Sequence, residues 1–280
     1  MDLTRLVPNQ IMIGVGVLVG EVVASSGIPP MEPAILGFFG PLTLGASTFA
    51  MNDYYDIETD KRGDRRDRPL VRGDISPGTA KLIFMIGFPL GLLLSSVINI
   101  PCLVIAAVFA SLAVIYNIYL KDTGLPGNLF IASTMGIPFI YGSLAVGGEI
   151  SLPVVTLTMM ALLSGAGREI LKDVMDVEGD SARNSRTLAR TRGIPFASRT
   201  SVPFFLIAIC LSPLPFLLQT GQSYHHNLKY LIPVAITDLL LMLVISRALK
   251  LSFSADAASL RKLSLLALGI GLVGFLLGTF

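Results

Sequence analysis

The chain has 280 residues, of which 52% are hydrophobic and only 14% are charged, and its mean hydropathy is +0.72. A soluble protein of this length would leave too much apolar surface in contact with water, so the composition excludes a soluble globular domain and indicates a membrane protein. The formal net charge of +2 is too small to indicate a nucleic-acid-binding protein. We therefore expect the lipid bilayer as a partner and no nucleic acid.

Nine apolar stretches follow one another along the chain, and each is about long enough to cross a bilayer as a helix. They cover residues 11–28, 34–51, 80–98, 102–119, 128–147, 152–170, 200–218, 231–249 and 263–280. The first stretch could also be a secretory signal peptide, but Glu21 interrupts it and the later stretches already require membrane insertion. The sequence thus predicts an all-α, polytopic membrane protein with nine transmembrane helices.

The basic residues predict how these helices are oriented. The N-terminal segment, the connections that follow each even-numbered span and the span ends beside them hold 20 of the 21 lysines and arginines, and only Lys229 lies on the other side. By the positive-inside rule, the N-terminus faces the cytoplasm and the C-terminus faces outward. We expect a multi-pass protein of the cell membrane whose functional end faces the cytoplasm.

Two acidic clusters with identical spacing lie at the cytoplasmic ends of the second and sixth spans. They are NDYYDIETD at residues 52–60 and KDVMDVEGD at residues 172–180, and seven of the 21 positions agree when 53–73 is aligned with 173–193. Both spans run toward the cytoplasm, as expected for a parallel duplication. We interpret residues 1–280 as a single domain with an internal repeat, roughly 1–120 and 121–240, followed by a last helix.

The spacing of the clusters indicates a bound cation. Aspartates three and four residues apart share one helical face, where their charges repel unless a positive group lies between them. Asn52, Asp56 and Asp60 fall on one such stripe and offer oxygen ligands. Oxygen-only ligands favour Mg²⁺, whose shell is commonly completed by substrate phosphate and water. Solvated loops that only set the topology are the simpler alternative, but two clusters with the same spacing argue against it.

The two clusters resemble the aspartate-rich motifs of the UbiA-type intramembrane prenyltransferases. The likeness extends over RPLVRG at residues 68–73 and REILKDVMDVEGD at 168–180, and it covers essentially the whole chain. It implies nine transmembrane helices around a central cavity, with a polar cytoplasmic cap and a lipid-facing opening. It also implies that Mg²⁺ and a diphosphate are bound by Asn52, Asp56, Asp60, Asp173, Asp176 and Asp180. Asp56, Asp60, Asp176 and Asp180 are the expected catalytic aspartates.

Further segments resemble the archaeal members of the family that make ether lipids. They are GREILKDVMDVEGD at 167–180, the Gly127–Asn128 pair, YGSLAVGG at 141–148 and LSPLPFLL at 211–218. The reaction implied is transfer of a geranylgeranyl group from geranylgeranyl diphosphate to the hydroxyl of geranylgeranylglyceryl phosphate. An aromatic prenyltransferase of quinone or haem biosynthesis, acting on 4-hydroxybenzoate or a similar acceptor, is the alternative. A transporter built on parallel repeats is more remote, because Glu21 and Asp238 are the main acids inside the spans.

The reaction requires cations near the leaving diphosphate, which gains negative charge as the allylic bond breaks. The candidates are Lys121, Lys172, Arg68 and Arg72. Lys121 is favoured, as a catalytic as well as a binding residue, because it is the only basic residue in its connection. It could instead be a topology marker at the end of a span.

Other candidates face the prenyl group or the acceptor. Tyr116, Asn117 and Tyr141 lie near span ends and could line the carbocation, although tyrosines there are also common interface anchors. Asn128 is a further expected substrate contact. Arg5 and Asn9 match a family position near the acceptor, and we expect Arg5 to pair with an acceptor anion.

Overall fold

The computed structural model describes residues 10–63, 65–183, 185–219 and 223–280, and within them all regular structure is helical. The helices are α1 (Ile11–Ser25), α2 (Met31–Arg62), α3 (Pro69–Arg72), α4 (Pro77–Ile98), α5 (Ile100–Ile115), the π-helix η2 (Tyr116–Leu120), α6 (Leu125–Ala145), α7 (Leu152–Met175), α8 (Val177–Arg183), α9 (Leu188–Arg192), α10 (Ile194–Leu211), α11 (Leu214–Leu217), α12 (Leu228–Ala248) and α13 (Ser254–Thr279).

Eight of these helical segments in the described residues are long and apolar enough to cross a membrane. They coincide with the second to ninth predicted spans. The first predicted span, residues 11–28, is the apolar helix α1, which has 15 residues and is therefore about 22 Å long, short of the roughly 30 Å hydrocarbon core. The fold is an all-α, multi-pass membrane architecture in which eight spans have the expected length and the first is shorter.

Local sequence signals set where several helices begin. Ser76 accepts a hydrogen bond through its Oγ from the Thr79 amide at 3.1 Å, and Asn99 accepts one through Oδ1 from the Cys102 amide at 2.8 Å. Proline occupies the first turn of α4, α5, α6, α7 and α10, where its missing N–H costs no hydrogen bond. These caps separate α4 from α5 with only Asn99 between them.

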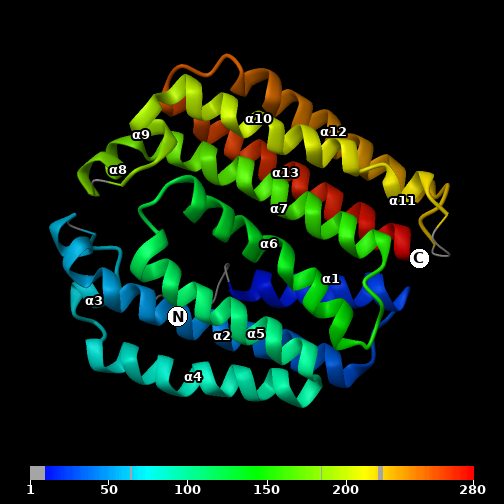
Figure 1. The fold of residues 1–280 in the computed structure, drawn as a ribbon, viewed down its shortest axis with the longest axis horizontal. Coiled ribbons are helices and arrows are strands. Elements are labelled where there is room, and N and C mark those ends of the chain that lie inside the picture. Colours follow the sequence, from blue (N-terminus) through cyan, green and yellow to red (C-terminus); the bar gives the residue numbers. More distant parts are fainter. Residues whose placement is uncertain (1–9, 64, 184, 220–222) are drawn as a thin grey trace.

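The helices form two groups that meet along α6 and α7 (Figure 1). Helices α1, α2, α4, α5 and α6 make one group, and α7, α10, α12 and α13 make the other. Helix α7 packs against α6, α10 and α13, and 78% of its most apolar stretch is buried, against 11% for α4 and for α5. Helix α7 therefore lies at the centre, whereas α4 and α5 expose apolar faces suited to lipid.

Both acidic motifs reach the same end of the bundle. Figure 1 places α3, α8 and α9 together at one end, with the C-terminus at the other. Helix α2 continues to Arg62, eleven residues beyond the predicted end of its span, and so carries the whole first motif on one helix. The expectation that the second aspartate trio shares one helix is wrong in detail: α7 ends at Met175 and Asp176 caps it with φ −96° and ψ 14°.

Candidate active site

A polar pocket of about 100 Å³ lies at the end of the bundle that carries the acidic motifs. It is lined by residues from η2 and the connection after it, from α6, α7 and α8, and from the segment that precedes α9. They are Tyr116, Lys121, Asp122, Gly124, Asn128, Glu169, Lys172, Asp173, Asp176, Asp180, Ser185 and Thr187. The pocket thus collects the three aspartates of the second motif together with two lysines.

Hydrogen bonds position the buried side of this pocket. The Asn128 side chain, at the start of α6, donates through Nδ2 to Asp173 Oδ2 at 2.7 Å. Both residues are buried, so the amide orients a carboxylate that water does not solvate. Lys172 pairs with Glu169 at 3.2 Å, one turn earlier on α7, which brings its ammonium group to the same face. The pocket wall therefore combines carboxylates with ammonium groups.

Lys121 connects the pocket to the first motif. It lines the pocket and forms an ion pair with Asp56 of α2, and both side chains are largely buried. Arg65 also lies near both acidic motifs. Its pKa is raised, chiefly by its hydrogen bond to Asp67 and in part by the charges of Asp60 and Asp176. Those two aspartates belong to different motifs, so both acidic clusters act on one surface region.

Arg68 neutralises two further acids of the first motif, Asp53 and Asp60. Its Nη1 donates to Asp53 Oδ1 at 3.1 Å, and its Nε lies 3.5 Å from Asp60 Oδ2. The Asp53 side chain is 2% exposed, so this charge requires a partner inside the protein. The RPLVRG segment therefore folds back onto α2 and binds its acidic face.

A tight backbone contact holds the connection that carries Lys121. The Asp122 carbonyl accepts a hydrogen bond from the Arg186 amide at 2.8 Å, and Asp122 Oδ1 accepts one from Ser185 Oγ at 2.6 Å. Gly124 has a φ of +73°, and a Cβ there would lie 2.4 Å from the Arg186 carbonyl oxygen. Glycine is required for both reasons, and the contact joins the connection before α6 to the segment before α9.

Comparison with known proteins identifies this architecture. Residues 13–278 match the UbiA prenyltransferase family. The chain belongs to the UbiA prenyltransferase family. It is 39% identical to the digeranylgeranylglyceryl phosphate synthase of Archaeoglobus fulgidus, over 100% of this chain and 94% of the relative, and 34% identical to that of Methanopyrus kandleri, over 99% and 97%.

Solved structures agree with this assignment. The fold resembles a structure of digeranylgeranylglyceryl phosphate synthase with a TM-score of 0.86 and 32% identity, covering 99% of this chain and 96% of that one. A UbiA homologue from Archaeoglobus fulgidus bound to GPP and Mg²⁺ has the same fold, with a TM-score of 0.70 and 18% identity over 98% of both chains. The chain is therefore a multi-pass membrane prenyltransferase of this family.

The structure brings some of the predicted site residues together and leaves others apart. Lys121, Lys172, Tyr116 and Asn128 line the pocket, and Tyr116 stacks on Phe130 with 5.2 Å between the ring centroids. Asp56 reaches the pocket through Lys121, whereas Asp60 is held by Arg68. Asp173, Asp176 and Asp180 all lie on the pocket wall.

Besides Asp60 and Arg68, which pair with each other, four predicted residues in the part of the chain that the structure describes lie away from the pocket. Arg72 binds Asp74 at 2.6 Å and the Arg66 carbonyl at 3.1 Å, so it stabilises its own loop. Tyr141 donates to Ser95 Oγ at 2.9 Å, 13 residues and about 20 Å along α6 from Asn128. Asn52 and Asn117 are half-buried and do not line the pocket either. Arg5 and Asn9 lie outside the described residues.

Several lining residues were not among the predicted ones. They are Asp122, Gly124, Glu169, Ser185 and Thr187. Glu169 could have been predicted from the sequence, because it lies three residues before Lys172 and therefore on the same face of the helix that carries the second motif. The other four come from connections, where no periodicity reveals which residues face a site.

The pocket fits a magnesium–diphosphate complex better than a metal held by protein alone. Among the described residues, no three Asp, Glu, His or Cys side chains converge closely enough to hold a metal ion by themselves. The available donors are nevertheless all oxygens, and the pocket also contains two lysines. Oxygen donors with an incomplete shell suit Mg²⁺, which normally keeps waters or substrate phosphates as ligands.

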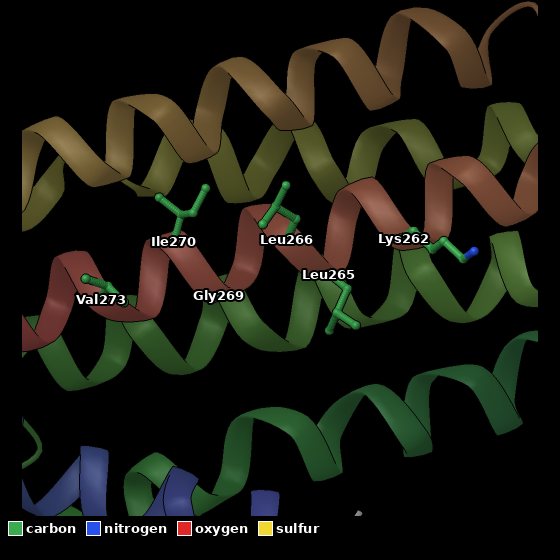
Figure 2. A pocket seen from close by; sticks show the side chains of 6 residues that line it. All are labelled: Lys262, Leu265, Leu266, Gly269, Ile270 and Val273. Atoms are coloured by element: carbon green, nitrogen blue, oxygen red, sulfur yellow. The ribbon is translucent and has the colours of Figure 1, made fainter. Parts of the chain in front are cut away.

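A larger hollow, of about 490 Å³, lies elsewhere on the molecule. Figure 2 shows that its six lining residues all belong to α13, where Lys262 stands at one end of an otherwise apolar row. They are Lys262, Leu265, Leu266, Gly269, Ile270 and Val273. One helix face cannot enclose a reacting substrate, so this hollow is not the catalytic site.

Proposed function

We propose that the protein is a digeranylgeranylglyceryl phosphate synthase, transferring a geranylgeranyl group from geranylgeranyl diphosphate to the free hydroxyl of geranylgeranylglyceryl phosphate. The observation that carries this proposal is the full-length similarity to relatives with that activity, at 30–39% identity in the best-covered cases. The polar pocket supports it, because its carboxylates and lysines suit a metal-bound diphosphate.

In this proposal the acidic motifs hold the diphosphate head through Mg²⁺. Asp173, Asp176 and Asp180 are its ligands from the second motif, and Asp56 and Asp60, with Asn52, its ligands from the first. Bound Mg²⁺ would neutralise charge on the diphosphate and so favour departure of the leaving group. Lys121 now pairs with Asp56, and Arg68 pairs with Asp60. When Mg²⁺ and the diphosphate bind these aspartates, the two cations are placed to donate to diphosphate oxygens instead.

The chain's own residues then stabilise charge and exclude water. The allylic carbon–oxygen bond breaks with its electron pair going to the diphosphate, and Lys121 and Lys172 stabilise the added charge. The Tyr116 ring, stacked on Phe130, offers a π-face beside the pocket for the positive carbon. The acceptor oxygen forms the new ether bond, and its proton passes to a carboxylate or to the released diphosphate.

We further propose that residues 1–280 are one domain that arose by duplication, with nine spans around a central cavity. The order long helix, short helix, long helix occurs at α2–α3–α4 and again at α7, α9 and α10, with α8 as an additional turn in the second copy. The positive-inside rule supports a cytoplasmic cap formed by α3, α8 and α9, with the N-terminus inside and the C-terminus outside.

Purified protein incubated with labelled geranylgeranyl diphosphate and either geranylgeranylglyceryl phosphate or 4-hydroxybenzoate tests the proposal. We expect a labelled digeranylgeranylglyceryl phosphate and no labelled aromatic acid. Labelling of the aromatic acid alone would assign the protein to the quinone or haem branch of the family. Excess chelator should stop the reaction, and transfer that persists without divalent metal would remove Mg²⁺ from the mechanism.

A further inference from the structure

Two arginines outside the polar pocket form no ion pair with a carboxylate among the described residues. Arg168 lies on α7 and is 9% exposed, and Arg261 lies on α13 and is half-buried. The Nε atom of each is fully buried and has no hydrogen-bond partner among the described residues. The charge of Glu169, the next residue in sequence, acts on Arg168, but the Glu169 carboxylate is itself paired with Lys172 at 3.2 Å.

The two arginines lie at the same depth on helices that pack against each other. Arg168 and Arg261 are within electrostatic range of one another across the contact between α7 and α13. Arg168 is seven residues before the end of α7, and Arg261 is seven after the start of α13, so both lie about 10 Å from the motif end of the bundle. Figure 1 shows that α13 runs from this end toward the C-terminus.

Such a pair requires an anion. Arginine stays protonated in proteins, so the two groups repel each other, and the carboxylate charge that acts on Arg168, that of Glu169, is shared with Lys172. The planar guanidinium presents parallel N–H donors that match two oxygens of a phosphate group. A phosphate between Arg168 and Arg261 would supply both the missing charge and the missing acceptors for the buried Nε atoms.

We propose that Arg168 and Arg261 bind the phosphate monoester of the prenyl acceptor, at a subsite separate from the diphosphate pocket. The assignment rests on the proposed function, in which the acceptor is a glycerol lipid that carries one phosphate. The diphosphate pocket has its own cations, Lys172 of α7 and Lys121 of the connection before α6, and Arg168 does not line that pocket. Arg168 is nevertheless adjacent to Glu169, which does line it, so the bound acceptor would lie beside the reacting end of the donor.

The surface of α13 suits the rest of such an acceptor. Leu265 lies one turn after Arg261 on the same side of the helix. It begins the apolar part of the hollow in Figure 2, which continues through Ile270 to Val273. A phosphate at Arg261 would therefore have an apolar track beside it for an isoprenoid chain, and Lys262 would add a third positive charge at the phosphate end.

Steady-state kinetics on Arg168→Gln and Arg261→Gln, each in the purified full-length protein, test the subsite. We expect the KM for geranylgeranylglyceryl phosphate to rise at least tenfold while the KM for geranylgeranyl diphosphate changes less than twofold. Arg247→Gln is the matched control, because Arg247 is an exposed arginine in the last turn of α12. It should change neither constant. An equal rise in both KM values, or no rise in either, would overturn the proposal.

A second acceptor separates phosphate binding from a structural effect. With geranylgeranylglycerol, which lacks the phosphate, the wild type and both variants should have the same KM, because there is no anion left to lose. A difference that persists with the neutral acceptor would mean that the arginines only support the fold. If Arg168→Gln does not fold, Arg261→Gln at the half-buried position decides alone, and Arg261→Lys should recover part of the affinity.

Nanodiscs of neutral or anionic phospholipid distinguish the acceptor from bilayer lipid as the source of the phosphate. We expect Arg261→Gln to raise the KM for geranylgeranylglyceryl phosphate equally in both kinds of nanodisc. If anionic lipid competes with the acceptor in the wild type and this competition disappears in the variant, the site binds bilayer phosphodiesters and the proposal is overturned. A wild type that does not prenylate geranylgeranylglyceryl phosphate at all would instead refute the proposed function. Normal wild-type transfer with unaffected variants would refute only the subsite.

Discussion

Lys121 forms an ion pair with Asp56, although 65 residues separate them in the sequence. The lysine comes from the connection between η2 and α6, and the aspartate comes from α2. This contact joins the first acidic motif to the pocket that contains the second one. The lysine is therefore the element through which two distant motifs can act on one bound diphosphate.

Replacing Lys121 with alanine should reduce kcat strongly while the bundle stays folded. The lysine stabilises charge that grows on the leaving group, and loss of one such donor typically costs a factor of about 10² to 10³ in kcat. Single-turnover rates with labelled geranylgeranyl diphosphate measure the effect. Lys61→Ala is the control, because Lys61 is exposed and its pair with Glu58 at 3.3 Å is a surface contact of little energetic value. Comparable rates for wild type and Lys121→Ala would show that the lysine only anchors Asp56.

Replacing Asp173 or Asp176 with asparagine should raise the Mg²⁺ concentration needed for half-maximal activity and lower the maximal rate. Both residues line the pocket, and the change removes a negative oxygen ligand while keeping the side-chain shape. Activity titrated against Mg²⁺ measures the shift. Glu178→Gln is a suitable control, since Glu178 belongs to the same motif but is exposed and does not line the pocket. An unchanged Mg²⁺ titration for Asp176→Asn would remove that residue from the metal site.

Replacing Arg68 with glutamine should destabilise the protein. The change leaves Asp53, whose side chain is 2% exposed, without its cation at 3.1 Å. Removal of one partner from a buried ion pair costs about 3–5 kcal/mol, and the low end applies because the Arg68 side chain is itself 18% exposed. Thermal unfolding in detergent compares it with Arg62→Gln, a change at an exposed arginine at the end of α2, the helix whose acids Arg68 binds. Equal melting temperatures for the two variants would contradict this role.

Replacing Gly124 with alanine should lower both stability and activity. The new Cβ would lie 2.4 Å from the Arg186 carbonyl oxygen. The alanine would also have to adopt the φ of +73° that Gly124 has. Gly147→Ala isolates the second effect, because Gly147 has a φ of +67° but nothing within 4 Å of the added Cβ. Backbone strain alone costs roughly 1–3 kcal/mol. We expect Gly124→Ala to unfold at a lower temperature than Gly147→Ala and to lose activity, since the clash displaces the connection that carries Lys121.

The sequence was sufficient for the membrane architecture and for the positions of both acidic motifs. Eight of the predicted spans correspond to long apolar helices, because a bilayer demands continuous apolar segments and the hydropathy of a segment is a local property. The repeated spacing of the aspartates was equally visible, since it depends on residues within two helical turns. Sequence did not reveal that α2 extends to Arg62 or that α7 ends at Met175, because propensities near a membrane surface favour no single end point.

Only the tertiary structure decided which groups meet. The pairing of Lys121 with Asp56, the hydrogen bond from Asn128 to Asp173, the binding of Asp53 by Arg68 and the proximity of Arg168 to Arg261 all join segments far apart in the chain or on different helices. No periodic pattern encodes such contacts, because they follow from how α2, α6, α7 and α13 pack around one another. The chain's local chemistry thus determined what the residues could bind, and packing determined which of them share a site.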